Sequence, residues 1–360
     1  MGFVGRAAVT LLVLVFAVSA RADTFRRDSV AFDRAGLSYD HWNRKPPEGW
    51  SPGINADARL GLRLPLDWDE HYRVRFLQYF QPNVFYMNSS LLCNFARRNR
   101  DQRREAARLF HAMYLRMMEF ADNEDGLIFI RSDFPFSPGG NALSGTEQTL
   151  ESVANFFGMT FVRDHMEAGW SSAIVNGFVM AGLVKALDCF DRPEYRETLE
   201  GLAAAYSRLH VAGQPAPGRW ISYVDEDGYL WFEEYPLTDG RATRVLNGHI
   251  FALFGLVLYA DKTGDESIIP LIEGGLTTLR DNGERFRREG RINAYSLRIK
   301  DYADYSPDRT VRQQCQLYAM TGEETFRRLA YAFRADIEAS GRPMPDWAVR
   351  HCAQSAELSD

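Results

Sequence analysis

The chain has 360 residues, of which 46% are hydrophobic and 25% are charged, with a formal net charge of −6 at pH 7. This length can bury a large core, and the overall charge does not indicate a polyanionic partner for the whole molecule. Arginines cluster locally at 97–104 and 285–291. These clusters could line a groove for an acidic polymer or form solvated helix faces. No recognised nucleic-acid-binding motif accompanies them, so we expect no nucleic-acid partner.

The N-terminal segment has the pattern of a secretory signal. Arg6 precedes an apolar run from Ala7 to Val18, and two candidate cleavage sites follow at 18–20 and 20–22. The run is too short to span a bilayer, and no later segment reaches about 18 uninterrupted apolar residues. We therefore expect a signal peptide at 1–22 and an exported chain, periplasmic or secreted, without a membrane span.

The four cysteines are scattered along the chain: Cys93, Cys189, Cys315 and Cys352. Export would permit disulfides, and three full pairings are possible. The wide spacing favours isolated buried thiols over disulfides, and no pair has the spacing of a zinc site.

After the signal, residues 23–65 are rich in Pro, Gly, Asp and Arg, which indicates an extended N-terminal arm. Residues 66–345 carry helical periodicity, and 346–360 form a polar tail. We expect helices at 89–99, 101–121, 148–157, 171–187, 194–209, 244–262, 266–280, 311–320 and 323–339. Strand patterns occur at 126–130 and 291–297, and an Asp-Gly turn predicts a hairpin over 220–232.

The helices alternate in character. Those at 171–187 and 244–262 are apolar on nearly every side, which predicts burial, whereas those at 194–209 and 266–280 are apolar on one side only. Asn176-Gly177 and Asn247-Gly248 begin the two buried helices similarly, a weak sign of an internal repeat. We therefore predict a mainly α fold, an incomplete α/α barrel (toroid) of inner and outer helices with short β-hairpins near the active-site cleft. A flat bundle is the alternative.

Several catalytic classes lack their residue patterns. The seven histidines include no pair at three- or four-residue spacing, so no metal site is predicted. No Gly-x-Ser-x-Gly elbow occurs, and no cysteine lies beside an obvious histidine partner.

The remaining candidate for catalysis is a pair of neighbouring acidic residues. Glu233, Glu234 and Tyr235 follow the aromatic strand Trp231-Phe232, and Pro236 stops it. On a strand the two glutamates point to opposite faces, and Tyr235 shares the face of Glu233 unless the strand ends at Phe232. Two solvated acids at a strand end are the competing interpretation.

A family resemblance extends this cluster. The segments that carry it are Gly169-Trp170-Ser171-Ser172-Ala173, Asn176-Gly177, Trp231-Phe232-Glu233-Glu234-Tyr235-Pro236, Val245-Leu246-Asn247-Gly248 and Tyr295-Ser296-Leu297-Arg298. Together they resemble the C-terminal domain of the D-glucuronyl C5-epimerases, over roughly 105–335. Members of that family invert carbon 5 of glucuronate within a polysaccharide such as heparosan, and their fold is an α/α helical domain preceded by β elements. We expect this chain to lack most of the large β-domain of animal members.

The resemblance implies particular site residues. The catalytic groups would be Glu234, Tyr235, Tyr295 and a third tyrosine, Tyr305 with Tyr302 as the alternative. A histidine that follows this third tyrosine in the family is missing from 312–317. The implied substrate-binding residues are Arg298, Asn247, Trp170, Asn176 and Glu233.

The chemistry suits these residues. Removing the carbon-5 proton, α to a carboxylate, creates an enolate, and inversion needs one proton-transfer group on each ring face. Arg298 could hold the substrate carboxylate through two hydrogen bonds. We expect no redox cofactor and, from the resemblance, an acidic polysaccharide as the partner; a homodimer is compatible with the sequence. The alternatives are a uronate lyase or a glycoside hydrolase on the same toroid, or a non-catalytic glycan-binding protein.

Overall fold

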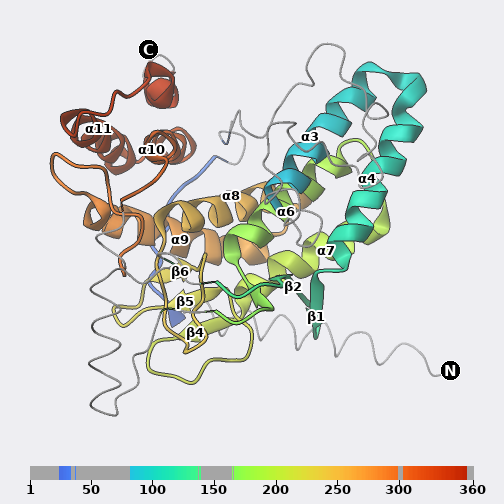
Figure 1. Cartoon of the computed structure of the whole chain (residues 1–360), viewed down its shortest axis with the longest axis horizontal. Helices are drawn as coiled ribbons and strands as arrows, with labels where there is room; N and C mark the ends of the chain where they lie inside the picture. The colour runs from blue at the N-terminus through green and yellow to red at the C-terminus, as the bar shows by residue number, and fades with distance from the viewer. Residues whose placement is uncertain are drawn as a thin grey trace.

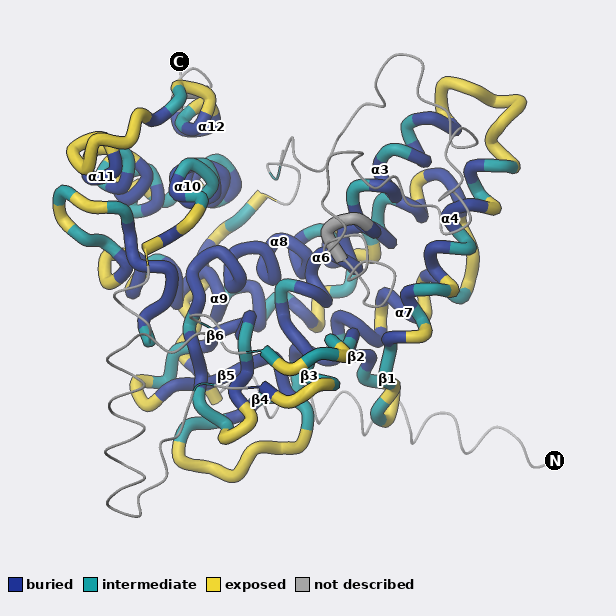
Figure 2. The backbone as a smooth tube through the Cα atoms, viewed as in Figure 1, coloured by how far each residue is buried: buried dark blue, intermediate teal, exposed yellow. Residues whose placement is uncertain are grey.

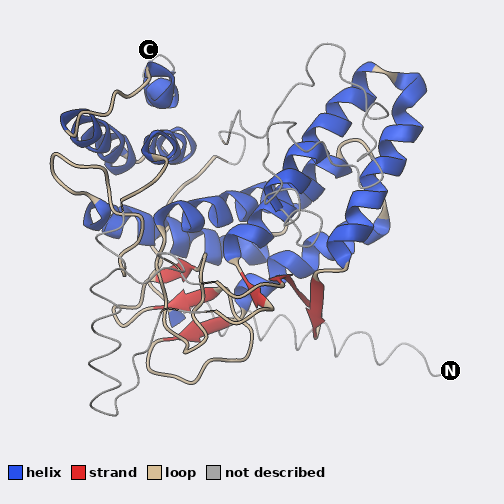
Figure 3. Cartoon of the chain, viewed as in Figure 1, coloured by secondary structure: helices blue, strands red, loops and turns tan. Residues whose placement is uncertain are grey.

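The computed structural model describes residues 24–33, 37, 82–136, 138, 164, 166–298 and 303–354. These residues are mainly helical, with small three-stranded sheets on one side of the helices (Figure 3). The predicted mainly α class is therefore confirmed. The predictions for the signal peptide, for 66–80, for the helix at 148–157 and for Tyr302 lie outside the described residues.

Two sets of long helices alternate along the chain. The inner set is α3 (Pro82–Arg98), α6 (Ala173–Leu187), α8 (Leu246–Thr263) and α10 (Pro307–Thr321). The outer set is α4 (Arg103–Met118), α7 (Pro193–Ala204), α9 (Ile269–Asn282) and α11 (Glu324–Ala339). α3 packs on α6, α6 on α8, α10 touches α8, and each inner helix packs on the outer helix that follows it (Figure 1). The predicted alternation is present, while closure of the row into a barrel stays a prediction.

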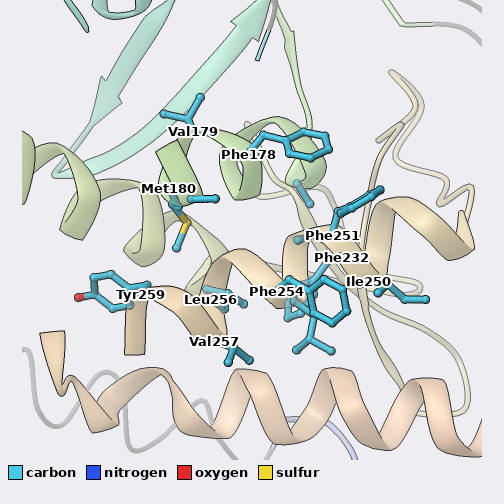
Figure 4. Close-up of a cluster of buried hydrophobic side chains, with 14 of the residues drawn as sticks. Phe178, Val179, Met180, Phe232, Ile250, Phe251, Phe254, Leu256, Val257 and Tyr259 are labelled. Carbon is cyan, nitrogen blue, oxygen red and sulfur yellow. The ribbon is translucent and has the colours of Figure 1, made fainter. Parts of the chain in front are cut away.

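Burial follows this alternation (Figure 2). In α8 every residue from Leu246 to Val257 is buried, as the all-round apolar pattern predicts, and α6 is buried almost as completely. Figure 4 shows their shared core with the strand residue Phe232; its labelled side chains are Phe178, Val179, Met180, Phe232, Ile250, Phe251, Phe254, Leu256, Val257 and Tyr259. The outer helices bury one face. The methionines of α4, Met113 and Met117, lie in the core as expected.

α6 and α8 cross in close contact through glycines. A Cβ on Gly255 would lie 2.6 Å from the Cα of Gly177, and a Cβ on Gly177 would lie 2.9 Å from the Cα of Ala252. Real Cβ atoms do not approach backbone this closely, so any side chain here would push the two inner helices apart.

The first sheet is antiparallel, in the order β1 (Ala121–Glu124), β2 (Leu127–Ser132) and β3 (Trp170–Ser171). The second contains β4 (Leu209–Val211), β5 (Ser222–Val224) and β6 (Leu230–Phe232), with β4 parallel to β5. β5 and β6 form the predicted hairpin, in which Ser222 lies opposite Phe232. Gly228 closes its turn at a φ of +82°, a conformation that favours glycine.

Some elements differ from their predictions. α3 begins at Pro82 rather than at residue 89, because the fixed φ of proline suits the first position of a helix. The segment 291–297 makes isolated bridges instead of a strand. Part of the expected polar tail is helical: 3₁₀ helix η9 (Asp346–Val349) and α12 (Arg350–Gln354) both contact α10. Further 3₁₀ turns are Arg100–Gln102, Ala205–Ser207, Glu266–Ile268 and Gly283–Phe286.

The interpretation of the cysteines as isolated thiols is wrong. Cys93 pairs with Cys189, joining α3 to the end of α6, and Cys315 pairs with Cys352, joining α10 to α12. Sequence separations of 96 and 37 residues hide these pairings until the helices are packed.

The described part of the N-terminal arm is extended and lies against the helical domain. The Arg26 amide donates to the Gly228 carbonyl at 2.8 Å, and the Asp33 amide donates to the Met320 carbonyl at 2.7 Å. Phe25 and Val30 are buried. No helix among the described residues is long and apolar enough to cross a membrane.

Candidate active site

The end of β6 is held against the start of α6. The Ser172 hydroxyl donates to the Glu234 carbonyl at 2.6 Å, and the Ala173 amide donates to the Glu233 carbonyl at 2.8 Å. β6 ends at Phe232, so the strict alternation of a strand does not extend through the two glutamates. Both acids are buried, at 0% and 6% exposure, which excludes the interpretation as solvated acids.

The Glu233 side chain is hydrogen-bonded to the loop that precedes α8. Its carboxylate accepts hydrogen bonds from the Thr243 amide (2.7 Å), the Thr243 hydroxyl (2.9 Å) and the Arg244 amide (3.1 Å). Burial raises its pKa to about 7. Arg244 has a φ of +53°, unusual for a residue with a side chain, and the carboxylate binds the backbone at that point. Glu233 therefore shapes the loop before α8, although the resemblance implies contact with substrate.

Glu234 faces the other way and joins two tyrosines. The Tyr295 hydroxyl donates to Glu234 Oε1 at 3.0 Å, and the hydroxyls of Tyr235 and Tyr295 lie 3.2 Å apart. Burial raises the pKa of Glu234, and burial together with the Glu234 charge raises the pKa values of both tyrosines. The structure thus brings three of the expected catalytic residues into one hydrogen-bonded chain.

The first turn of α8 packs directly on Glu234. A Cβ on Gly248 would lie 2.6 Å from the Cβ of Glu234 and closer still to its Oε2. Only glycine fits there. The N-terminus of α8 carries the partial positive charge of the helix dipole, which favours the ionised carboxylate.

Two aromatic side chains, Trp170 and Phe136, lie beside Tyr235. The Trp170 indole donates to the Phe134 carbonyl at 2.9 Å, and its ring lies 5.9 Å from the Tyr235 ring. Phe136 stacks on Trp170 and lies 5.1 Å from Tyr235. Trp170 is thus placed at the site, where it orients Tyr235.

The two asparagines of the Asn-Gly pairs differ. The Asn176 amide donates to the Ile128 carbonyl at 3.0 Å and accepts from the Ile130 amide at 3.1 Å, so it pins β2 to α6. Asn247 is equally buried, but its Oδ1 has no hydrogen-bond partner among the described residues. Asn247, not Asn176, is therefore available to a ligand.

Tyr305 lies on the outer side of the cluster. Its ring is 58% exposed and lies 5.7 Å from the Tyr295 ring. The guanidinium of Arg309 lies over it, 4.8 Å from the ring centre.

Arg298 has a protein partner. Its Nε and Nη2 each donate to Asp164 at 2.7 Å, in the two-bond geometry that was predicted for the substrate carboxylate. Arg241 contacts the same carboxylate at 3.1 Å. Asp164 was not singled out in the sequence, because it lies 134 residues from Arg298 along the chain.

α10 supplies site residues that the sequence analysis missed. Its buried residues include the polar Thr310, Gln313, Gln314 and Gln316 at 0–1% exposure, beside apolar ones such as Val311 and Leu317. Polar side chains on the buried face of a helix are unusual, and this pattern was the available signal. Buried polar atoms without a partner among the described residues include Glu234 Oε2, Asn247 Oδ1, Arg309 Nε and Nη2, and Gln313 Oε1.

The described residues contain no group of three or more His, Cys, Asp or Glu side chains that could hold a metal ion. The site instead offers a buried carboxylate, hydrogen-bonded phenols and a nearby guanidinium. These groups can exchange a proton with a carbon acid and offset the negative charge that forms.

A family model described as D-glucuronyl C5-epimerase C-terminus matches residues 151–335, more than half of the chain. This range contains Glu234, Tyr235, Tyr295 and Tyr305. No curated protein matches the chain.

Proposed function

The chain belongs to the D-glucuronyl C5-epimerase family, and on that basis we propose that it inverts carbon 5 of D-glucuronate in a heparosan-like polysaccharide to give L-iduronate. The family supports a glucuronyl C5-epimerase activity in general. The polymer and the assignment of proton-transfer roles below are our proposals.

One observation carries the proposal: the hydrogen-bonded chain Tyr235–Tyr295–Glu234, buried at the end of β6. An epimerase needs two groups that exchange protons with one carbon from opposite faces. A carboxylate and a phenol at the two ends of one chain can serve as that pair. Their raised pKa values make Glu234 a stronger base than an ordinary glutamate and keep the tyrosines protonated as donors.

The proposed steps balance in protons. The Glu234 carboxylate removes the carbon-5 proton, leaving an enolate, and the Tyr235 hydroxyl returns a proton to the opposite face. Glu234 is then protonated and Tyr235 is a phenolate. Transfer of one proton from Glu234 to Tyr295, and of another from Tyr295 to Tyr235, restores the starting state along the hydrogen bonds present in the structure. Tyr305 contacts the sugar from the exposed side of the site.

The decisive experiment is NMR of heparosan in deuterated water with the purified chain. The expected result is loss of the carbon-5 proton signal and appearance of iduronate, with no chain cleavage. Glu234→Gln should abolish the exchange. Glu226→Gln, an exposed acid on the β5–β6 turn, is the matched control and should retain it.

Other outcomes would overturn the proposal. New ultraviolet absorbance from an unsaturated uronate, with shortened chains, would identify a lyase that uses the same base. Saturated reducing ends would identify a hydrolase. Binding of heparosan with neither exchange nor cleavage would identify a glycan-binding protein.

We also propose that the chain is exported. The disulfides Cys93–Cys189 and Cys315–Cys352 support this, because such bonds persist in oxidising compartments. Mass spectrometry of the mature chain tests it: cleavage near residues 20–22 and the absence of free thiols are expected, and an intact N-terminus with four free thiols would contradict it.

A further inference from the structure

The epimerisation proposed above, on which this inference rests, needs a cation beside the substrate carboxylate. Removing the carbon-5 proton moves a second negative charge onto that carboxylate. A guanidinium placed against it stabilises the enolate more than the ground state. Resemblance assigns this task to Arg298, but the contacts within the protein point elsewhere.

Arg298 already has a partner within the protein. Asp164 accepts both of its donated hydrogen bonds at 2.7 Å, and Arg241, which also pairs with Asp239, contacts the same carboxylate. For Arg298 to bind substrate, this charge-assisted pair would have to break, which would leave the partly buried Asp164 carboxylate without its two hydrogen bonds from Arg298. Arg298 therefore holds Asp164 in place.

Arg309 is less completely paired, because a side-chain hydrogen bond joins it to Tyr305 while two of its nitrogens lack a partner among the described residues. It lies in the first turn of α10, and its Nε and Nη2 are buried without a hydrogen-bond partner among the described residues. Its guanidinium lies between two rings, 4.8 Å from the centre of Tyr305 and 5.9 Å from that of Phe251. Buried N–H groups left unpaired are costly, so a residue held in this way indicates a ligand position.

The position of Arg309 is fixed relative to Glu234 by neighbouring contacts. One turn along α10, Gln313 Nε2 donates to the Asn247 carbonyl at 3.5 Å, next to Gly248, which packs on Glu234. On the other side, Tyr305 connects Arg309 to Tyr295, which donates to Glu234. Consistent with this proximity, Arg309 and Glu234 act electrostatically on each other's pKa.

The start of α10 is itself anchored. Asp304 accepts hydrogen bonds from the Ser306 amide (2.9 Å), from Asn293 (3.3 Å) and from the Thr310 hydroxyl. The Asp304 carboxylate lies near enough to influence the Arg309 charge, but its hydrogen bonds go to these other groups. Asp304 is thus a positioning residue that holds the first turn of α10.

We propose that Arg309, and not Arg298, binds the glucuronate carboxylate and stabilises the enolate. Its Nε and Nη2, which lack a hydrogen-bond partner among the described residues, form the fork that suits a carboxylate. Asn247 Oδ1 and Gln313 Oε1, both buried and unpaired among the described residues, accept hydrogen bonds from hydroxyls of the same sugar. The ligand class is a uronate with a free carboxylate.

Binding measurements distinguish the role of Arg309 from that of Arg298. The probes are a heparosan oligosaccharide and its carboxyl-reduced form, which carries glucose in place of glucuronate. Affinities of the full chain for both are measured by calorimetry. Loss of a charge-assisted hydrogen bond to a carboxylate weakens binding by roughly 10- to 100-fold. Arg309→Gln should show that loss for the uronate and less than about threefold change for the reduced form.

Three further variants complete the set. Arg309→Lys keeps the charge without the fork and should bind the uronate with intermediate affinity. Arg298→Gln should weaken both probes equally, because it removes the pair with Asp164 rather than a contact with the substrate carboxylate. Arg327→Gln, which removes an exposed pair with Glu324, is the surface control. Melting temperatures identify any variant that fails to fold. If Arg309→Gln does not fold, Arg309→Lys is compared with the unaltered chain in its place.

A loss specific to the carboxylate in Arg298→Gln, or equal losses for both probes in Arg309→Gln, would overturn the assignment. Carbon-5 exchange is measured separately. If the unaltered chain binds uronate through Arg309 without exchanging the proton, the epimerase proposal fails while the binding assignment stands. If exchange persists in Arg309→Gln with an unchanged KM, the assignment fails alone.

Discussion

The starts of α6 and α8 carry the same Asn-Gly pair in different places. In α6, Asn176 and Gly177 lie in the second turn, where they bind β2 and allow the close crossing with α8. In α8, Asn247 and Gly248 lie in the first turn, against Glu234. A shift of two residues relative to the helix start moves one pair into the scaffold and the other to the site. The shared dipeptide therefore does not give the two helices a shared role.

The largest expected effect is that of Gly248→Ala on activity. The new methyl group would overlap Glu234 and push the carboxylate away from Tyr295. Loss of a positioned general base costs about 10²–10⁴-fold in rate. Carbon-5 exchange in deuterated water is the measurement. A variant that exchanges within tenfold of the unaltered chain would show that Glu234 is not the base.

Gly177→Ala tests the structural role of the Asn-Gly pair in α6. Its methyl group would meet the backbone of Ala252, and overpacking of this kind costs about 1–3 kcal/mol. We expect a lower urea midpoint, with exchange per folded molecule reduced much less than in Gly248→Ala. If the two alanine variants lose stability and activity in the same proportion, the proposed difference in role between the Asn-Gly pairs of α6 and α8 is wrong.

Asn176→Ala should mainly affect stability. It leaves the Ile128 carbonyl and the Ile130 amide unpaired in the core, at about 1–3 kcal/mol for each group. Asn247→Ala removes an oxygen that has no protein partner among the described residues, so it should cost less than about 1 kcal/mol and raise KM by roughly three- to tenfold. Denaturant titration and exchange kinetics distinguish the two. Reversed effects would assign the ligand contact to α6.

The smallest expected effect is a shift in the pH profile. Burial raises the pKa of Glu234, and the hydrogen bond from Tyr295 lowers it. Because the base must be ionised, the exchange rate should fall on acidification at a pH above the ordinary glutamate value. In Tyr295→Phe the pKa rises further, so the residual activity should lose rate at a still higher pH. If the fall in rate on acidification moved to lower pH in Tyr295→Phe, the proposed role of Glu234 would be contradicted.

Local patterns were sufficient for much of the fold. The β5–β6 hairpin, the all-round burial of α8 and the one-sided outer helices follow from turn chemistry and apolar periodicity, which act over a few residues. The same local signal, together with family resemblance, identified Glu234 and its tyrosines.

Other features depend on contacts between distant segments. The opposite roles of Glu233 and Glu234 depend on the loop at Thr243, and the pairing of Arg298 depends on Asp164. Both disulfides join helices that periodicity alone does not place together. Residue type indicates that an arginine is needed, but only packing shows that Arg309 keeps two buried donors without a partner among the described residues.

The bond between Cys315 and Cys352 closes a covalent loop around the C-terminal helices. One end of this loop is α10, whose first turns carry Arg309 and Gln313. Chain made in a reducing cytosol would hold α10 through non-covalent contacts alone, including its packing on α11, α12, η9 and α8. Recombinant production for any assay of this site should therefore use an oxidising compartment, and the thiol content of each batch should be recorded beside its activity.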